Sequence, residues 1–434
     1  MRLFVASLIF VTWISNGFAI TQKLLFGSVI FYSIGYKLIL FFLLSAHVLF
    51  LISIKKGRLR VEENHRNYIF YWLIYSFVSI VFIKYINDYP FSYILFAFWV
   101  LFFYLIIFSL VSYCGWHLEP QGSQLRVRNY ILTPIIVCFS AIIILLGVLQ
   151  GIFQEALINI DFSSDGYLIT KSLDFIGGGY RAHSIFYSGM AFGEFSTFLT
   201  FISISALCSS YVSRKYAIIK KVFIFLMLFV TLYSSYLSLT RNIYLLNLIG
   251  ISYLILNYYT KRSALSWQLF SFLIPIISLA LVPTIISLVS SEEVLDTKSL
   301  FARFAHWTAA WGLFSEGTDM QKIFGLGLIS NDRFEHTSWL IFDNLPLAIL
   351  MYSGVTGLIF TLILLFYVQR FVLENFRNNE ISPVLNAVSA FWFCLPTTSL
   401  LNVNLNTPLL LICFALSYYG FKKPLNGIKR TQLS

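Results

Sequence analysis

Apolar residues occur along this chain in long, nearly uninterrupted runs separated by short polar stretches. A helix needs roughly 20 apolar residues to cross the hydrocarbon core of a bilayer, and it satisfies its own backbone hydrogen bonds there. The pattern therefore predicts an all-α, polytopic integral membrane protein with about 12 transmembrane helices. The runs lie at 3–20, 31–54, 67–83, 91–113, 130–149, 189–212, 217–238, 243–259, 266–289, 345–369, 383–399 and 405–421.

Composition excludes several classes of protein. Of the 434 residues, 58% are hydrophobic and only 11% are charged, whereas soluble globular chains carry roughly 25% charged residues. A soluble enzyme, a nucleic-acid-binding protein and a disordered chain are therefore excluded. The five cysteines fall in or beside the expected spans without Cys-x-x-Cys spacing, which indicates core packing rather than disulfides or metal ligands.

The distribution of charge predicts the orientation of the chain. With a cytoplasmic N-terminus, the cytoplasmic segments hold 20 of the 30 Lys and Arg residues and 5 of the 19 acidic residues. Cytoplasmic loops of membrane proteins are enriched in Lys and Arg. We therefore expect both termini in the cytoplasm, and we interpret the net charge of +11 as a topology signal rather than as a site for nucleic acid. Residues 1–20 also resemble a secretory signal peptide, but an uncleaved first helix fits the further spans better.

The expected spans divide the chain into five parts. Two long segments lie on the extracytoplasmic side, and we expect the chemistry there because all other loops are short. The parts are five N-terminal helices in 1–150, a loop at 151–188, helices 6–9 in 189–289, a large loop with an interfacial helix at 290–344, and helices 10–12 with a cytoplasmic tail in 345–434.

Three arginines on the acidic, extracytoplasmic side are the candidate substrate-binding residues. Arg181 precedes the span that starts near 189, Arg241 opens the span at 243–259, and Arg303 lies in the expected interfacial helix. Arg241 stands at the positive end of a helix dipole, with Thr240 or Ser238 available as N-cap. A helix N-terminus combined with a guanidinium is a phosphate-binding arrangement. Each arginine alone is equally explained as an interfacial anchor, but together they favour a shared anionic substrate such as a lipid-linked diphosphate.

Candidate bases for proton transfer lie in the same two loops. His336 and Asp343 are the candidate catalytic residues, and His183 and His306 are further possibilities. Asp343 or Asn344 is alternatively the N-cap of the following helix. Phe301, Phe304, Ala305, Thr308 and Trp311 recur at helical spacing, which predicts an amphipathic helix along the membrane interface. No metal-binding motif is present, so we expect neither a metal nor another cofactor.

Four local patterns in residues 180–360 resemble the bacterial O-antigen polymerase (Wzy-type) and O-antigen ligase (WaaL-type) superfamily. Each pattern is weak alone, and their order and shared topology carry the resemblance. They are Arg181-Ala182-His183-Ser184-Ile185-Phe186; Ser238-Leu239-Thr240-Arg241 leading to Gly250; Arg303 with Trp307 and Gly325-Leu326-Gly327; and Asp343-Asn344 ahead of Gly354-Val355-Thr356-Gly357.

The resemblance implies a GT-C-like glycosyltransferase of the bacterial inner membrane with its active site facing the periplasm. Its donor and acceptor would be undecaprenyl-diphosphate-linked oligosaccharides, its surroundings membrane lipid, and a further partner a chain-length regulator protein. Arg181, Arg241 and Arg303 would bind the diphosphate, and His336 or Asp343 would take a proton from the acceptor. Ligases carry His-Asn where this chain has Asp343-Asn344, which favours a polymerase.

Alternative functions remain open at this stage. A ligase would transfer the glycan to the lipopolysaccharide core. A transporter or flippase would place charges near the membrane midplane and often contain inverted repeats; here only Lys37 and Glu194 are candidate intramembrane charges, and no repeat is visible. A non-catalytic scaffold of the cell envelope is the third alternative.

Overall fold

The structure is a computed structural model in which the described residues are predominantly helical. It describes residues 63–87, 94, 140–155, 157, 175–176, 179–184, 189–208, 217–260, 263–289, 297–327, 344–376 and 383–399. The helices are α3 (Glu63–Ile86), α6 (Gly189–Cys208), α7 (Ala217–Leu237), α8 (Arg241–Thr260), α9 (Ala264–Val289), α10 (Thr297–Glu316), α11 (Asp319–Phe324), α12 (Leu345–Phe376) and α13 (Pro383–Ser399). A further helix covers Ser140–Phe153.

Most of the expected spans coincide with these helices. Three of them, α6, α8 and α12 as far as Glu374, are long and apolar enough to cross a membrane by length and composition. Shorter apolar helices cover Ile74–Ile86, Ser140–Phe153, Lys221–Leu237 and Ala264–Pro275. These findings are compatible with a helical membrane protein. The expected spans at 3–20, 31–54 and 405–421, and nearly all of 91–113, lie outside the described residues.

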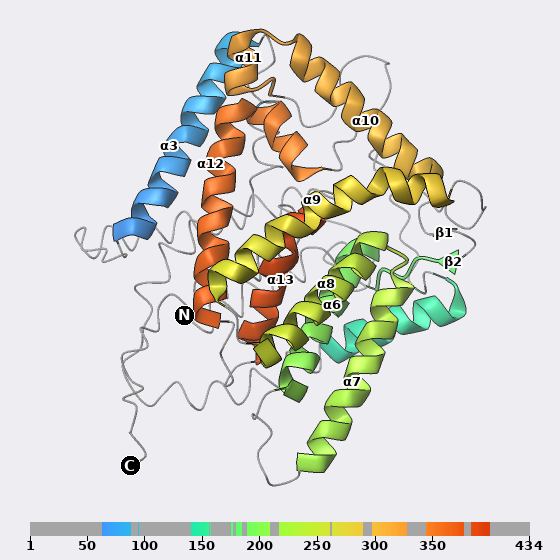
Figure 1. The fold of residues 1–434 in the computed structure, drawn as a ribbon. Helices are drawn as coiled ribbons and strands as arrows, with labels where there is room; N and C mark the ends of the chain where they lie inside the picture. The colour runs from blue at the N-terminus through green and yellow to red at the C-terminus, as the bar shows by residue number, and fades with distance from the viewer. Residues whose placement is uncertain are drawn as a thin grey trace, which may run out of the picture.

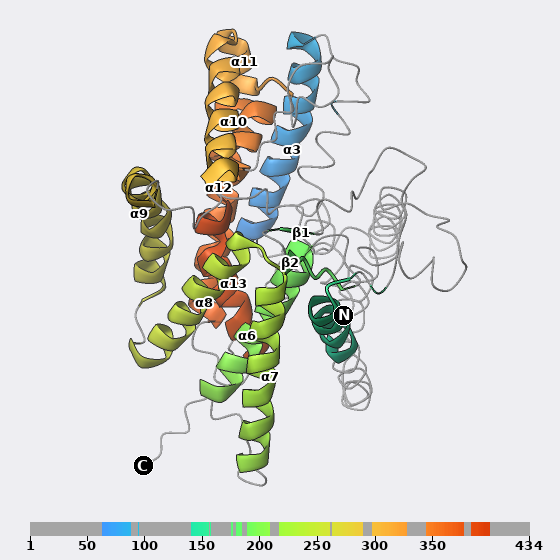
Figure 2. The same ribbon diagram turned by 90° about the vertical axis from the view of Figure 1, so that its right-hand side faces the viewer.

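The centre of the described helices is formed by α6 and α13. In both views α13 lies among α6, α8, α9 and α12, and it packs against each of them (Figures 1 and 2). Of the most apolar stretch of α6, 72% is buried, compared with 44% for α8. Phe201 of α6 fits against Gly250 of α8, where an added Cβ would come within 2.0 Å of the ring. Small residues allow such close helix contacts within membranes.

Polar side chains join α9, α12 and α13 inside the apolar core. Gln369 Nε2 donates to Ser271 Oγ at 2.8 Å and to the Trp392 carbonyl at 2.9 Å. Gln268 Nε2 donates to the Phe366 carbonyl at 2.9 Å. Interhelical hydrogen bonds of this kind contribute to helix association in membranes. They fix the positions of α9 and α13, which border the α8 helix considered below.

The span expected at 345–369 coincides with α12, which changes direction within it. Gly354 has φ 68° and ψ −171°, a conformation that glycine adopts readily and other residues do not. Figure 1 shows the short segment before Gly354 leaving the axis of the longer segment that follows. A second chain segment, Gly325–Gly327, lies against the break.

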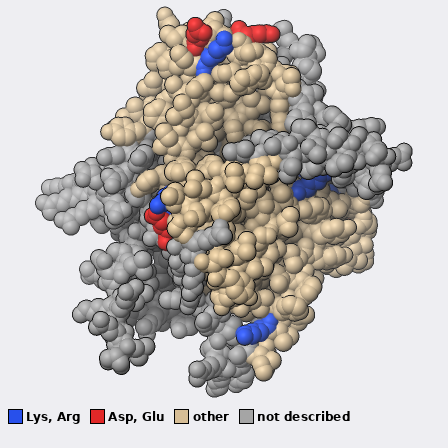
Figure 3. Space-filling view, in the orientation of Figure 1, with Lys and Arg blue, Asp and Glu red and all other residues tan. Residues whose placement is uncertain are grey.

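The apolar surface of the described helices is extensive. On α7, Phe223, Leu226 and Phe229 are all more than half exposed. In the space-filling view, described Lys, Arg, Asp and Glu side chains occupy only small separate patches on a broad uncharged surface (Figure 3). A surface of this kind is expected where lipid replaces water as the solvent.

Candidate functional site

The Arg181 segment follows a two-stranded hairpin. Strand β1 (Phe175–Ile176) pairs antiparallel with β2 (Gly179–Tyr180), and residues 181–184 continue from it without regular structure. The Ala182 amide donates to the Leu237 carbonyl at 3.0 Å. This bond attaches the segment to the C-terminal end of α7.

Gln150 fixes the same segment from the other side. This fully buried side chain lies in the helix Ser140–Phe153. Its Oε1 accepts from the amides of His183 at 3.1 Å and Ser184 at 2.6 Å, and its Nε2 donates to the Ser184 carbonyl at 3.2 Å. Ser184 has φ 54°, so its amide and carbonyl depend on a side chain rather than on regular secondary structure. A buried backbone group needs such a partner.

The guanidinium of Arg181 is held at the turn between α7 and α8. Arg181 Nε donates to the Ser238 carbonyl at 3.1 Å, and Nη2 donates to Thr240 Oγ1 at 2.7 Å. The side chain passes the first residue of α6, Gly189, where an added Cβ would lie 2.6 Å from Arg181 Cγ. Because Gly189 has no side chain, there is space for the Arg181 side chain to reach the turn.

Arg241 is the first residue of α8 and is exposed at the same turn. The Thr240 carbonyl accepts from the Ile243 amide at 2.9 Å, so Thr240 occupies the expected N-cap position. Its hydroxyl is used differently from the sequence expectation, because it donates to the Ser238 carbonyl at 2.9 Å and accepts from Arg181. The two arginines thus converge on one turn at the positive end of α8.

Three exposed tyrosines border this turn. The rings of Tyr236 and Tyr244 stack with centroids 6.1 Å apart, and those of Tyr233 and Tyr236 with centroids 6.5 Å apart. The Tyr244 hydroxyl donates to the Tyr236 carbonyl at 2.9 Å. Tyrosine is enriched where a membrane protein meets the headgroup region, because the ring is apolar and the hydroxyl polar.

The structure places His183 in a supporting position. Its Nε2 lies 2.9 Å from the Tyr180 hydroxyl, and its Nδ1 is buried. Tyr180 is itself 3% exposed, and its amide donates to Gln154 Oε1 at 2.6 Å. His183 therefore belongs to the packing that holds the Arg181 segment, rather than offering a ring nitrogen to a substrate. Glu194, expected as an intramembrane charge, is buried at 3% exposure near the start of α6.

Other candidate residues fall partly or wholly outside the described residues. Arg303 lies in α10, so its expected helix is present, but its side chain is outside the described part. His336 and Asp343 also lie outside the described part. Asn344 is described, and its Oδ1 accepts from the Leu347 amide at 3.0 Å, which confirms Asn344 as the N-cap of α12. On α10, Thr308 and Trp311 of the expected apolar stripe are exposed.

The motif Gly325-Leu326-Gly327 contacts α12 at the motif Gly354-Val355-Thr356-Gly357. The amides of Leu326 and Gly327 donate to the carbonyls of Met351 at 2.9 Å and Tyr352 at 3.0 Å. Thr356, just after the break in α12, donates its hydroxyl to the Ile323 carbonyl at 2.5 Å. The backbone carbonyls that the break at Gly354 releases are thereby satisfied, as buried backbone in a membrane requires.

Sequence reasoning missed Gln150 and the break at Gly354. Gln150 ends an apolar run at 130–149, and a glutamine at the end of such a run indicates a polar partner without indicating which one. Within the part of the chain that the structure describes, no three His, Cys, Asp or Glu side chains are grouped as they would be around a metal ion.

The described geometry is an arginine pair on a turn at the N-terminus of an apolar helix. It offers positive charge and backbone dipole to an anion at one end of a hydrophobic surface. Comparison of the chain with protein-family models, with curated proteins and with solved structures finds no match in any of the three.

Proposed function

We propose that this protein is an O-antigen (surface polysaccharide) polymerase of the bacterial inner membrane. It joins undecaprenyl-diphosphate-linked oligosaccharide repeat units at the periplasmic face, as a GT-C-like glycosyltransferase. The observation that carries the proposal is the convergence of Arg181 and Arg241 at the start of α8. These residues come from two separate patterns that the polymerase and ligase superfamily also has.

The proposed reaction depends on a site that binds the diphosphate anion. A hydroxyl of the acceptor glycan attacks the anomeric carbon of the donor; a bond from that carbon to the acceptor oxygen forms, and the bond to the diphosphate oxygen breaks. Charge grows on the departing diphosphate, and donors aimed at that charge lower the barrier. Arg241 and Arg181 at a helix N-terminus have the chemistry to supply them.

The remaining roles are assigned to residues of the second loop. His336 or Asp343 accepts the proton of the acceptor hydroxyl, and Arg303 is the third diphosphate ligand. The donor is already activated, so no nucleotide sugar, ATP or metal takes part. The pair Asp343-Asn344, in place of His-Asn, supports a polymerase over a ligase.

The test is synthesis by the purified full-length chain in lipid nanodiscs, supplied with lipid-linked repeat units. A polymerase produces a ladder of lengthened products, also in the presence of a chelator. A ligase leaves the length of the repeat units unchanged until lipopolysaccharide core is added, and a flippase never changes it. A result of either kind would reject the polymerase proposal.

Arg241→Lys tests the site itself. Lysine keeps the charge but loses the planar fork that suits phosphate oxygens, so we expect the ladder to fall at least tenfold at equal protein level. Arg370→Lys is the matched control, because Arg370 is an exposed arginine that pairs with Glu374 on α12. If Arg241 is only an interfacial anchor, both variants make normal ladders, since lysine anchors about as well.

A further inference from the structure

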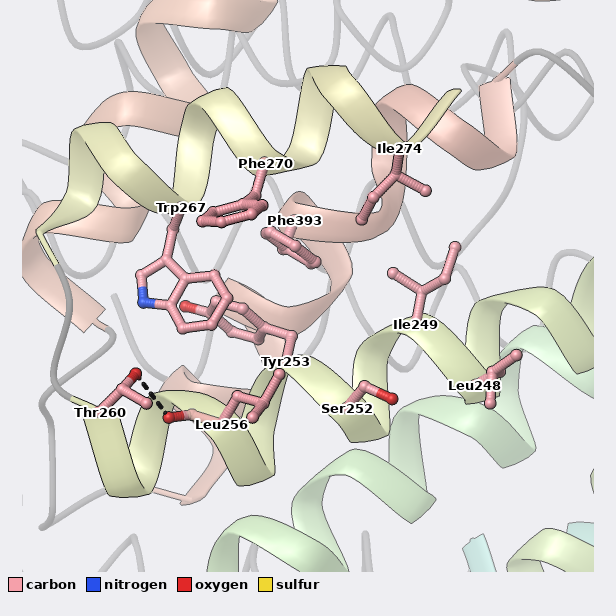
Figure 4. Close-up of a pocket in the computed structure, with 10 residues that line it drawn as sticks. All are labelled: Leu248, Ile249, Ser252, Tyr253, Leu256, Thr260, Trp267, Phe270, Ile274 and Phe393. Atoms are coloured by element: carbon pink, nitrogen blue, oxygen red, sulfur yellow. Dashed lines mark hydrogen bonds between the residues drawn. The ribbon is translucent and has the colours of Figure 1, made fainter. Parts of the chain in front are cut away.

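A groove lies between α8 and α9, with α13 behind it (Figure 4). Its volume is about 480 Å³. Its inner wall is aromatic: the rings of Tyr253 and Phe393 stack with centroids 4.5 Å apart, and Trp267 meets Tyr253 edge-on at 5.0 Å. All three side chains are buried.

The rim of the groove is apolar and exposed. Leu248 and Leu256 of α8 are 66% and 50% exposed, and Phe270 of α9 is 39% exposed. The Thr260 hydroxyl at one end donates to the Leu256 carbonyl at 2.8 Å, as Figure 4 shows. Most of the lining is ring faces and aliphatic groups, which suit a hydrocarbon chain better than a polar ligand.

An exposed stripe of α8 connects the groove with the arginine turn. Arg241, Tyr244, Leu248 and Ser252 follow one another at spacings of three and four residues, and all four are exposed. Residues at these spacings lie on one face of a helix. A ligand with an anionic head at Arg241 can therefore continue down the same face into the groove, at Leu248 and Ser252.

The length of this path distinguishes the kinds of lipid. At about 1.5 Å of rise per residue, Leu248 lies about 10 Å and Thr260 about 28 Å from Arg241 along the helix axis. The hydrocarbon core is about 30 Å thick, so one leaflet supplies about 15 Å. A phospholipid with its head at Arg241 ends in the first part of the groove. A chain that reaches Thr260 from that head must pass through both leaflets.

We infer that the groove binds the isoprenoid tail of the polyprenyl diphosphate whose head is bound at Arg241. This inference rests on the proposed function for the identity of the head. The long, branched chain of such a lipid has the length that the path requires, and its methyl branches pack against the aromatic wall. Holding the tail restricts the lipid before the reaction, which lowers the entropy lost when the diphosphate is positioned.

Binding measurements with two chain lengths test the groove separately from the head site. The purified full-length chain in nanodiscs is titrated with undecaprenyl diphosphate and with farnesyl diphosphate, whose three isoprene units reach only the upper part of the groove. Ser252→Trp places a large ring in the groove from an exposed position. We expect it to weaken undecaprenyl diphosphate binding at least tenfold and farnesyl diphosphate binding less than twofold.

Three further variants complete the comparison. Ile255→Trp is the matched control, since Ile255 is exposed on α8 but does not line the groove, and it leaves both affinities unchanged. Leu256→Trp is a second plug and repeats the effect of Ser252→Trp. Arg241→Lys weakens both lipids, because it acts on the head. If Arg241→Lys has no effect while the plugs act, the tail site stands and the diphosphate site is rejected.

Other outcomes overturn the inference. Unchanged affinity for undecaprenyl diphosphate in both plugged variants means that the tail lies elsewhere. An equal loss for both chain lengths means that the substitutions act on the head site. In a second experiment, a photoreactive group near the middle of the undecaprenyl chain is expected to label the α9 peptide that contains Trp267 and Phe270. Loss of that label when phosphatidylglycerol is added in excess would assign the groove to phospholipid.

Discussion

Two places in the molecule join distant segments: the turn between α7 and α8, and the crossing where Gly325–Gly327 meets α12 at Gly354. The two connections are made by different groups. At the turn, polar side chains make the connection: Arg181 reaches Ser238 and Thr240 with hydrogen bonds of 3.1 and 2.7 Å. At the crossing, glycines let the two backbones touch directly. A Cβ on Gly325 would lie 2.1 Å from the Tyr352 carbonyl oxygen, and one on Gly354 would lie 2.3 Å from the Ile323 carbonyl oxygen.

The difference separates architecture from chemistry. The amides of Leu326 and Gly327 are hydrogen-bonded to carbonyls of α12, and Gly325–Gly327 are buried, so the crossing holds the end of α11 against α12. At the turn, several side-chain hydrogen bonds together join the segments, and Arg241 stays exposed. A single substitution at the crossing should therefore cause a large loss of stability, whereas substitutions around the turn should cause smaller losses that depend on how many hydrogen bonds they remove.

The largest expected effect is that of Gly354→Ala. The new Cβ collides with the backbone oxygen of Ile323, and alanine is strained at φ 68°. We expect a loss of roughly 3 kcal/mol or more of stability, measured as thermal unfolding of the purified chain and as its yield in membranes. Gly312→Ala is the control, because an added Cβ there meets nothing within 4 Å. A stable Gly354→Ala protein would remove the distinction between the two regions.

A smaller loss is expected for Gln150→Ala, which removes the support of the Arg181 segment. Three hydrogen bonds disappear, and the buried amide of Ser184 loses its partner. An unsatisfied buried group costs about 1–3 kcal/mol, so we expect about that loss in thermal unfolding, with reduced ladder formation. Glu155→Ala, at an exposed residue near the same helix end, serves as the comparison. Equal effects of the two variants would show that the Gln150 bonds do not hold the segment.

The smallest effect is expected for Thr240→Val, which removes only the hydroxyl between Arg181 and Ser238. The two hydrogen bonds of that hydroxyl contribute about 1 kcal/mol each, and Arg181 keeps its own bond to the Ser238 carbonyl, so the unfolding midpoint should fall less than in Gln150→Ala. Thr240→Ser retains the hydroxyl and should restore the midpoint. If valine and serine at this position behave alike, the connection to Arg181 depends on the Ser238 carbonyl alone.

Local sequence was sufficient for the helices and for some of their ends. Apolar runs predicted the helices that begin near 189, 217, 243 and 383, because a chain in lipid must satisfy its backbone within each segment. The sequence offered Asp343 and Asn344 as N-caps of α12, and in the structure Asn344 Oδ1 accepts from the Leu347 amide. The position of Arg241 at the start of α8 also followed from the sequence, since a run of apolar residues begins immediately after it.

Contacts between distant segments were decided only by the tertiary structure. A glycine within an apolar run is compatible with a continuous helix, and Gly354 breaks α12 where the amides of Leu326 and Gly327 bind the carbonyls of Met351 and Tyr352. Likewise, Arg181 meets Thr240 because α6 begins with a glycine and α7 ends beside it, and the groove beside Trp267 exists because α13 lies behind α8 and α9. Hydrophobic periodicity reports which segments avoid water, whereas partners of a buried polar group are chosen by the geometry that packing creates.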